Sequence, residues 1–333
     1  MSDQLIPPTM APDARIFVAG HRGMVGSAVV RRLAQAGYEN IVVASRDELD
    51  LLDQGAVRAF LRRGKLDWVV VAAAKVGGIQ ANNEFRADFL YENLAIQTNL
   101  IEGAHRAEID QLLFLGSSCI YPRDCEQPIR EDYLLTGPLE RTNEPYAIAK
   151  IAGIKLCEVY AEQYGRRYFS LMPTNLYGPN DNYDLRTSHV LPALIRKAHD
   201  AKFAGSRSLT VWGSGTPRRE FLHVDDLADA CLFLMEREHR ATMVNVGVGK
   251  DVTIAELARM IARTVGFEGH LEFDSSKPDG TPRKLLDTSR MERLGWKATI
   301  GLEEGLSRTY RDFLADPRFG RAEARDALRG GHA

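Results

Sequence analysis

Short apolar runs alternate with longer amphipathic segments through the first half of this 333-residue chain. Residues 16–19 form an apolar run that ends at a glycine, and residues 24–36 carry apolar side chains at helical spacing. Apolar runs at 41–44, 68–74 and 112–115 predict buried strands, because strands covered on both faces are almost continuously apolar. This alternation predicts right-handed crossovers and a doubly wound parallel sheet, which is an α/β fold of the Rossmann type.

The alternation continues along the chain before the pattern becomes less regular. Residues 86–106 predict a long helix, Pro145 stands where it can open a helix at 146–164, and residues 168–172 return to strand. We expect the less regular second half to form a smaller α/β substrate-binding lobe. The predicted organisation is a flexible N-terminal segment at 1–14, a Rossmann domain at 15–179 to which 221–249 returns, a substrate-binding lobe at 180–220 and 250–315, and a loose tail at 316–333.

Composition narrows the class of protein. A chain that is 44% hydrophobic and 26% charged can bury a large core, as ordinary soluble enzymes do. Its formal net charge of −2, with acids and bases mixed, favours neither a nucleic-acid nor a membrane surface. The four cysteines lack the spacing of a zinc site or a disulfide framework, so we predict no metal. Residues 1–13 do not resemble a signal peptide and no apolar run is long enough to span a bilayer, so we expect a cytoplasmic protein.

A glycine-rich loop follows the first predicted strand and opens the first helix. Glycines at these spacings permit a tight turn and let backbone amides approach a pyrophosphate at the helix N-terminus. The position of the loop between a strand and a helix predicts a dinucleotide site. The loop consists of Gly20, His21, Arg22, Gly23, Met24, Val25 and Gly26.

The residues after the second strand indicate which dinucleotide binds. NAD enzymes usually carry Asp or Glu there, to bind the ribose 2′-hydroxyl. This chain has Ser45 and Arg46, and Arg22 lies in the glycine loop, so two guanidinium groups and a hydroxyl favour the 2′-phosphate of NADP(H). The alternative is that Arg46 is a solvated loop residue and that Asp47 serves an NAD ribose.

Tyr146 and Lys150 lie one turn apart on the same face of a predicted helix. A lysine charge beside a tyrosine lowers the pKa of the phenol, which makes it a usable proton donor to a carbonyl that receives hydride. Ser117 follows the fourth strand, where open α/β sheets bind ligands, and can hydrogen-bond the same carbonyl oxygen. The alternative is a half-buried helix face with a solvated lysine.

Two further residues have both a structural and a chemical interpretation. A buried cysteine usually behaves as a small hydrophobe, but Cys119 stands near the carboxyl end of a strand, where side chains face the crevice. His189 begins a helix after a polar loop, and many such histidines only cap the helix or face solvent.

Taken together, these motifs resemble the extended short-chain dehydrogenase/reductase family, from about Arg15 to Asp316. Within the family the chain is most similar to epimerase-reductases of GDP-linked keto sugars. The resemblance implies an NADPH-dependent enzyme that epimerises GDP-4-keto-6-deoxy-mannose at C3 and C5 and reduces C4, giving GDP-L-fucose. The segments that carry it are residues 20–26, 73–79, 116–122, 143–150, 173–179 and 212–217.

The resemblance also implies roles for single residues. Ser117, Tyr146 and Lys150 would form the hydride-transfer triad, while Cys119 would be the base and His189 the acid of the epimerisations. A thiolate at Cys119 needs a lowered pKa, which we expect from nearby His189 or from the positive surroundings of the cofactor. Positions that match cofactor contacts in the family are Lys150, Pro173, Thr174, Asn175, Leu176 and His189, and positions that match substrate contacts are Lys197, Trp212, Arg219 and Asp279. Lys197 stands where the family often has arginine.

Several alternatives remain open at this point. An epimerase-reductase of another GDP-4-keto sugar, such as a heptose, has the same motifs. Related dehydratases carry an Asp-Glu pair after the catalytic Ser or Thr, where this chain has Ser118 and Cys119, and simple 4-epimerases need no Cys/His pair. A regulator that only senses NADPH usually loses the tyrosine or the lysine, and both are present here. Family analogy further implies a homodimer through the helices at 86–106 and 146–164.

Overall fold

The structure is a computed structural model that describes residues 10–277 and 279–319. Its central sheet is parallel throughout. The second strand lies on one side of the first strand, and all later strands of this sheet lie on its other side. The strand order therefore reverses at the first strand. The strand order is β2 (Ile41–Val42), β1 (Ile16–Ala19), β3 (Trp68–Val71), β4 (Gln111–Leu115), β5 (Arg167–Pro173) and β9 (Met243–Val246).

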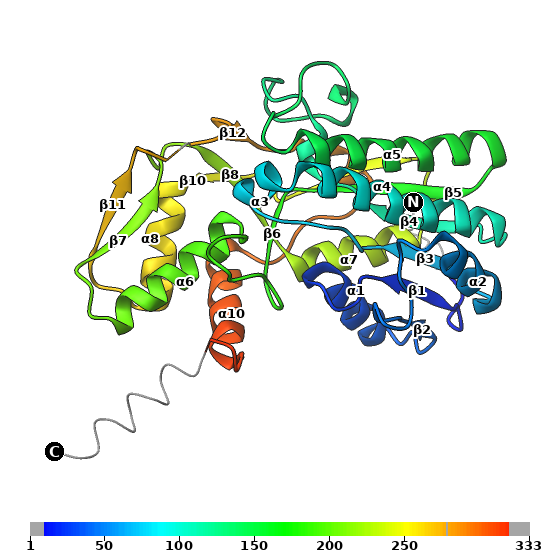
Figure 1. The fold of residues 1–333 in the computed structure, drawn as a ribbon, viewed down its shortest axis with the longest axis horizontal. Coiled ribbons are helices and arrows are strands. Elements are labelled where there is room, and N and C mark those ends of the chain that lie inside the picture. The colour runs from blue at the N-terminus through cyan, green and yellow to red at the C-terminus, as the bar shows by residue number, and fades with distance from the viewer. Residues whose placement is uncertain (1–9, 278, 320–333) are drawn as a thin grey trace, which may run out of the picture.

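Helices cover both faces of this sheet (Figure 1). In β1, Ile16 and Val18 point toward one hydrophobic core, and Phe17 and Ala19 toward the other, as the alternation of side chains along a strand requires. The doubly wound Rossmann fold expected from the sequence is therefore confirmed. One face is covered by α1 (Met24–Gln35) and α7 (Val224–Met235), and the other by α2 (Gln54–Gly64), α4 (Arg86–Arg106) and α5 (Glu144–Tyr164).

Two strands are shorter than the sequence predicts. The apolar runs 41–44 and 68–74 continue beyond β2 and β3, but the chain leaves the sheet after Val42 and Val71. After β3 the backbone of residues 72–73 packs against Gly20 of the glycine loop. The approach is so close that an added Cβ on Gly20 would lie 2.7 Å from the Ala73 nitrogen. Apolar residues here line the loops at the carboxyl edge, where periodicity does not distinguish them from strand residues.

A smaller lobe lies at one end of the sheet, on the left in Figure 1. Its strand β8 (Arg218–His223) pairs with three short strands, and β7 (Ser208–Trp212) pairs with β11 (His270–Asp274). The three partners of β8 are β6 (Asn175–Tyr177), β10 (Asp251–Thr253) and β12 (Arg283–Lys284). The helices that pack on this lobe are α6 (Val190–Phe203), α8 (Ile254–Val265) and α10 (Leu302–Ala315), and the short helices α3 (Ile79–Glu84) and α9 (Ser289–Arg293) complete the fold.

Both chain ends pack further than the sequence predicts. Met10 and Ala14 are buried in the core, although the sequence analysis expected a flexible segment up to residue 14. Phe319 stacks on Phe313 and contacts Tyr183, so the packed part extends past residue 315. The remainder of both predicted ends lies outside the described residues. Within the described part of the chain, no helix is long and apolar enough to cross a membrane.

Candidate active site

The glycine loop lies between β1 and α1, at the switch point of the sheet. Gly20 has a φ of +87°, a conformation that side-chain-bearing residues rarely adopt, and its Cα faces the backbone of Ala73. Gly23 forms the N-cap of α1 without a side-chain cap, which leaves the amides of the first turn for a ligand. This close-packed backbone at a helix N-terminus fits the pyrophosphate of a dinucleotide.

Ser45 has a different partner from the one that the sequence suggests. Its backbone N–H and its hydroxyl both donate to Glu48 Oε2, at 2.7 and 2.8 Å. These two bonds lower the pKa of the Glu48 carboxyl, and the charges of Arg22 and His21 lower it further. The hydroxyl therefore caps its own turn, while the exposed guanidinium groups of Arg22 and Arg46 remain for a 2′-phosphate.

The carboxyl end of β4 and the first turns of α5 bring three predicted catalytic residues together. Ser117 follows β4 and caps a 3-10 turn, where its Oγ accepts from the Cys119 N–H at 3.3 Å. Lys150 is only 3% exposed, and its Nζ donates to the Leu115 carbonyl at 2.7 Å. The same Nζ lies 5.8 Å from the centre of the Tyr146 ring.

The pKa values at these residues correct one expectation from the sequence. Burial raises the pKa of the Tyr146 phenol, and the charge of a Cys119 thiolate raises it further, so the expected lowering by Lys150 is wrong. The reason is that Lys150 turns its ammonium toward the Leu115 carbonyl, and burial lowers the pKa of Lys150 to about 8. A phenol that stays neutral is still the form that donates a proton to a carbonyl.

Cys119 lies beside Ser117 in the same 3-10 turn and is 8% exposed. Burial raises the pKa of its thiol, and the largest opposing effect is the charge of Lys284, followed by the Ser117 hydrogen bond and Lys150. The charge that most strongly opposes the rise of the Cys119 pKa is therefore that of Lys284, which the sequence analysis did not consider. The sequence analysis expected this effect from His189 or from the positive surroundings of the cofactor.

His189 forms the N-cap of α6, a helix that packs on the lobe. Its side chain is exposed to solvent on one side. Desolvation by the surrounding protein lowers the pKa of the imidazole, and the charge of Lys284 lowers it further. The segment before it is clamped to the Rossmann domain, because Gly78 N–H donates to the Thr187 carbonyl at 2.7 Å. A Cβ on Gly78 would lie 2.6 Å from the Ser188 carbonyl oxygen, so glycine is required at this approach.

The predicted substrate residues gather around Trp212, whose indole is 51% exposed. The Nζ of Lys197 lies 4.6 Å from the ring centre of Trp212, and Lys277, which the sequence analysis missed, lies 5.5 Å from it. Asp279 accepts from Ser214 N–H at 2.7 Å and from the Ser214 hydroxyl at 2.9 Å, which closes the turn after Trp212.

Arg219 connects this group to the catalytic edge. Burial lowers the pKa of its guanidinium, and the nearby charge of Asp279 opposes that effect. On its other side, Arg219 lies close enough to Lys284 to lower the pKa of that lysine. Arg219 and Lys284 are in register on the neighbouring strands β8 and β12, so their two positive charges lie side by side.

Residues 173–176 also lie at the carboxyl edge, where Pro173 ends β5, Thr174 joins the two strands, and Asn175 and Leu176 belong to β6. Thr174 Oγ1 and Asn175 Nδ2 donate to the Glu220 carbonyl oxygen, at 3.3 and 2.8 Å. The Glu220 side chain itself is fully buried and accepts from the backbone N–H groups of Val248 and Gly249. Sequence reasoning missed Glu220, because its role depends on backbone partners that are remote along the chain.

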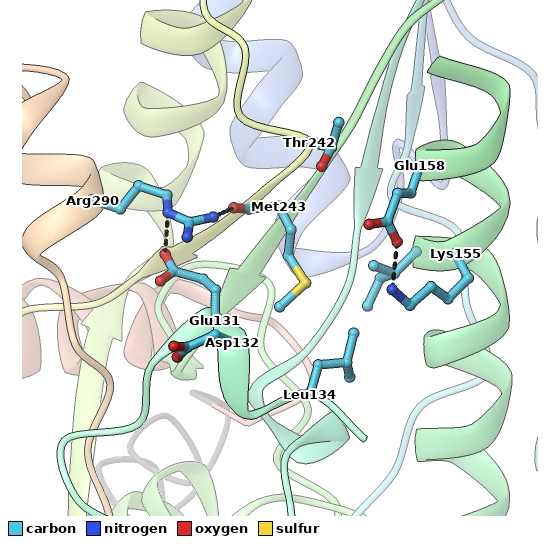
Figure 2. Close-up of a pocket in the computed structure, with 9 residues that line it drawn as sticks. Glu131, Asp132, Leu134, Lys155, Glu158, Thr242, Met243 and Arg290 are labelled. Carbon is cyan, nitrogen blue, oxygen red and sulfur yellow. Dashed lines mark hydrogen bonds and ion pairs between the residues drawn. The ribbon is translucent and has the colours of Figure 1, made fainter. Parts of the chain in front are cut away.

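A cavity of about 280 Å³ lies beside the start of edge strand β9 (Figure 2). Its charged groups pair with one another, since Lys155 binds Glu158 at 2.6 Å and Arg290 lies 3.5 Å from Glu131. Arg290 also donates to the Met243 carbonyl at 2.7 Å. None of the predicted site residues lines this cavity, and we assign its charges to the packing of the sheet edge.

Comparisons with known proteins agree with this geometry. A model of the NAD dependent epimerase/dehydratase family matches residues 16–247. GDP-L-fucose synthase of Escherichia coli (strain K12) is 56% identical over 309 residues, which cover 90% of this chain and 96% of that protein. Among solved structures, a GDP-L-fucose synthetase from Naegleria fowleri bound to NADP is 30% identical with a TM-score of 0.86, and the match covers 94% of this chain and 96% of that one.

A second solved structure bears on the choice of sugar. A GDP-D-glycero-L-gluco-heptose synthase from Campylobacter jejuni, solved in the presence of NADPH, is 36% identical with a TM-score of 0.84, and the match covers 92% of this chain and 100% of that one. It shares the fold and the extent of the chain, at lower identity than the Escherichia coli protein. The glycine loop, the Ser-Tyr-Lys arrangement and these matches together show that the chain belongs to the NAD dependent epimerase/dehydratase family.

Proposed function

We propose that this protein is an NADPH-dependent GDP-L-fucose synthase, which epimerises GDP-4-keto-6-deoxy-mannose at C3 and C5 and reduces its C4 ketone. The observation that supports the proposal is that Cys119 is a neighbour of Ser117, Tyr146 and Lys150. A reductase needs only the last three residues. A thiol beside them adds a base that can reach the carbons next to the ketone.

In the epimerisation, the Ser117 and Tyr146 hydroxyls hydrogen-bond the C4 carbonyl oxygen. Removal of a proton from a flanking carbon by Cys119 then gives an enolate, and the same two donors stabilise its negative oxygen. His189, at the N-terminus of α6, would return a proton to the opposite face.

In the reduction, Tyr146 donates its proton to the C4 oxygen. Bound NADPH supplies the hydride. Lys150 keeps a positive charge next to the tyrosine at neutral pH, which stabilises the phenolate that forms when the proton leaves. The contact from its Nζ to the Leu115 carbonyl holds this charge in place.

The remaining predicted residues bind the two nucleotides. Arg22 and Arg46 hold the 2′-phosphate of NADPH, since guanidinium groups bind phosphate in a bidentate way. Arg219 and Lys197 would bind the GDP diphosphate through their positive charges, and the exposed Trp212 ring offers a surface on which a nucleobase can stack.

The test follows NADPH absorbance with GDP-4-keto-6-deoxy-mannose and identifies the product sugar by NMR. We expect NADPH oxidation with GDP-L-fucose as the product. Absence of oxidation with that sugar, together with intact NADPH binding, would contradict the proposal. Turnover of a GDP-4-keto-heptose alone would favour the alternative that the 36% identical heptose synthase represents.

We further propose that the protein is a homodimer in the cytoplasm, with α4 and α5 at the interface. Both helices expose large apolar side chains, among which Tyr91 on α4 is 68% exposed. On α5 the exposed apolar residues are Ile148, Val159 and Tyr164. The four cysteines are free, which suits a reducing compartment. Sedimentation equilibrium at micromolar concentration tests the dimer, and a monomer mass throughout would contradict it.

A further inference from the structure

The short 3-10 turn that carries Ser117 and Cys119 is closed by long hydrogen bonds. The Cys119 N–H donates to Ser117 Oγ and the Ile120 N–H donates to the Ser117 carbonyl, both at 3.3 Å. An ordinary N–H···O bond in a protein is about 2.9–3.0 Å long. A single 3-10 turn with such bonds needs support from outside to keep its side chains in fixed positions.

Tyr121 supplies this support at the end of the turn. It is the C-cap of the turn, its side chain is buried, and its hydroxyl donates to Asn245 Oδ1 at 2.5 Å. Asn245 lies on β9, and β5 separates β9 from β4 in the sheet. The bond therefore ties the turn that follows β4 to a strand that is not a neighbour of β4. Burial raises the pKa of Tyr121, so its hydroxyl keeps the proton that it donates.

Asn245 is itself held by the protein around it. Its side chain is fully buried, and its Nδ2 donates to the carbonyls of Ile129 and Asp287, at 2.9 and 3.3 Å. Its backbone N–H donates to Glu131 Oε1 at 3.0 Å. Carbonyl oxygens only accept, so the amide nitrogen must face them and the amide oxygen must face Tyr121. A rotation of the amide would leave buried polar atoms without partners, which makes Asn245 a rigid anchor.

The other two groups of the hydride-transfer triad do not stand on this turn. Tyr146 and Lys150 belong to α5, and the Lys150 Nζ is held by the Leu115 carbonyl, which precedes the turn. Loss of the anchor at Tyr121 should therefore displace Ser117 and Cys119 relative to the groups on α5. The chemistry that depends on the turn should suffer more than the chemistry that depends on the helix.

We propose that Tyr121 is a positioning residue, which acts through its bond to Asn245 to hold the turn of Ser117 and Cys119 in place for proton abstraction. This inference rests on the proposed function, in which Cys119 is the base and Ser117 binds the enolate oxygen. Both groups must be placed precisely, because a displacement of about 1 Å can cost about 10²-fold in rate.

The first test measures the turn without any sugar. Tyr121→Phe removes one oxygen, keeps the aromatic ring, and leaves Asn245 Oδ1 without its donor. Hydrogen–deuterium exchange of the full chain is followed at the amides of Cys119 and Ile120. We expect exchange there to become about tenfold faster, which is the order of effect of one lost hydrogen bond on a local opening. Unchanged exchange at these two amides would contradict the proposal.

Tyr168→Phe is the matched control. Tyr168 is also buried, and its hydroxyl donates to the Ile109 carbonyl at 2.8 Å, at the end of the sheet where β4 and β5 begin. Both variants lose one buried hydroxyl and one hydrogen bond, so both should unfold at a lower denaturant concentration. Only Tyr121→Phe should speed exchange in the turn. Equal acceleration in both variants would mean that global stability controls the turn, and the proposal would fall.

The second test separates epimerisation from hydride transfer. With NADP⁺ present, deuterium uptake from D₂O into GDP-4-keto-6-deoxy-mannose reports proton abstraction alone, and NADP⁺ reduction by GDP-L-fucose reports hydride transfer. We expect Tyr121→Phe to slow deuterium uptake about tenfold or more with an unchanged KM, since misplacement of the base acts on the chemical step. Hydride transfer should fall less, and Tyr168→Phe should change neither rate.

Lower stability of Tyr121→Phe with both rates unchanged would give the hydroxyl a purely structural role and overturn the proposal. An equal loss of both rates with a raised KM would mean general damage to the site, with the same consequence. If the parent enzyme handles neither sugar, the proposed function fails, while the exchange measurement still decides whether Tyr121 holds the turn.

Discussion

The candidate cleft has two walls that are built differently. On the Rossmann wall, Ser117 and Lys150 are hydrogen-bonded to nearby backbone, and both come from the 36 residues between Leu115 and Lys150. On the lobe wall, His189, Arg219 and Lys284 come from three distant segments, and the two cations lack a carboxylate partner among the described residues. One wall offers fixed donors for an oxygen, and the other offers open positive charge.

This difference agrees with the proposed function. A carbonyl that becomes an alkoxide or enolate needs hydrogen-bond donors that do not reorganise, which suits the fixed polar groups of the Rossmann wall. A diphosphate brings its own negative charge, which suits cations without a carboxylate partner on the lobe wall. The opposite face of β8 and β12, where Asp251 neutralises Arg218 and Arg283, shows the structural arrangement that the cleft face lacks.

The largest effect should come from Tyr146→Phe on the Rossmann wall. Loss of the proton donor should slow NADPH oxidation by about 10²–10⁴-fold, the usual contribution of a general acid. Deuterium uptake should fall less, because Ser117 still holds the enolate oxygen. Stopped-flow absorbance and NMR exchange measure the two rates. If both fall to the same extent, the two walls do not divide the chemistry as we describe.

The next effect concerns the cofactor end of the Rossmann wall. Arg46→Ala should raise the KM for NADPH about tenfold, since one charge-assisted hydrogen bond to phosphate is worth about 1.5–3 kcal/mol and exposure reduces it. The KM for NADH should stay the same, because NADH lacks the 2′-phosphate. Steady-state kinetics with both cofactors measure the ratio, and an equal rise for both would remove Arg46 from phosphate binding.

Lys150 should make hydride transfer depend on pH. Burial disfavours its ammonium, so the group is charged below its pKa of about 8 and loses its proton above it. The hydride-transfer rate should therefore fall about tenfold per pH unit above that value. Lys150→Arg should flatten this alkaline limb at a lower rate, because guanidinium stays protonated. A limb that persists in Lys150→Arg belongs to another group.

The smallest effect should come from Asp251→Asn, behind the cleft. Loss of the carboxylate leaves Arg218 and Arg283 without their partner and should lower the free energy of unfolding by about 1 kcal/mol, because both guanidinium groups are two-fifths exposed. The pH at which iodoacetamide alkylates Cys119 at half its maximal rate should not change. Denaturant unfolding combined with alkylation kinetics measures both, and a shift in that pH would show that the two faces are coupled.

Much of the Rossmann part was predictable because its signals are local. The predicted helix 86–106 has the bounds of α4, and Pro145 lies in the first turn of α5 as expected. The glycine loop, Ser117, Tyr146 and Lys150 stand in segments whose function depends on the adjacent strand or helix. Their catalytic roles remain predictions until the variants are measured, but the structure does bring Lys150 to the carboxyl end of β4, which Ser117 follows.

The lobe was less predictable, because short strands carry little periodicity. β12 has two residues and β10 has three, and only their pairing with β8 gives them a face and a direction. Glu220 and Lys284 are ordinary charged residues in the sequence, and nothing in their neighbours indicates burial or the lack of a counter-ion. The bond from Ser45 to Glu48 was readable as a capping pattern, but a phosphate role seemed the stronger interpretation of the same hydroxyl.

The sequence by itself determined the class of fold, the dinucleotide loop and the residues of the hydride-transfer wall, because these depend on hydrophobic periodicity and on spacings within one strand–turn–helix unit. Only the tertiary structure decided which cations face the cleft and in what state the reactive groups stand. Burial raises the pKa of Tyr146 and Cys119, and a lysine 165 residues after Cys119 opposes that rise at the thiol. Such effects depend on distance through space and on desolvation, which spacing along the chain does not encode.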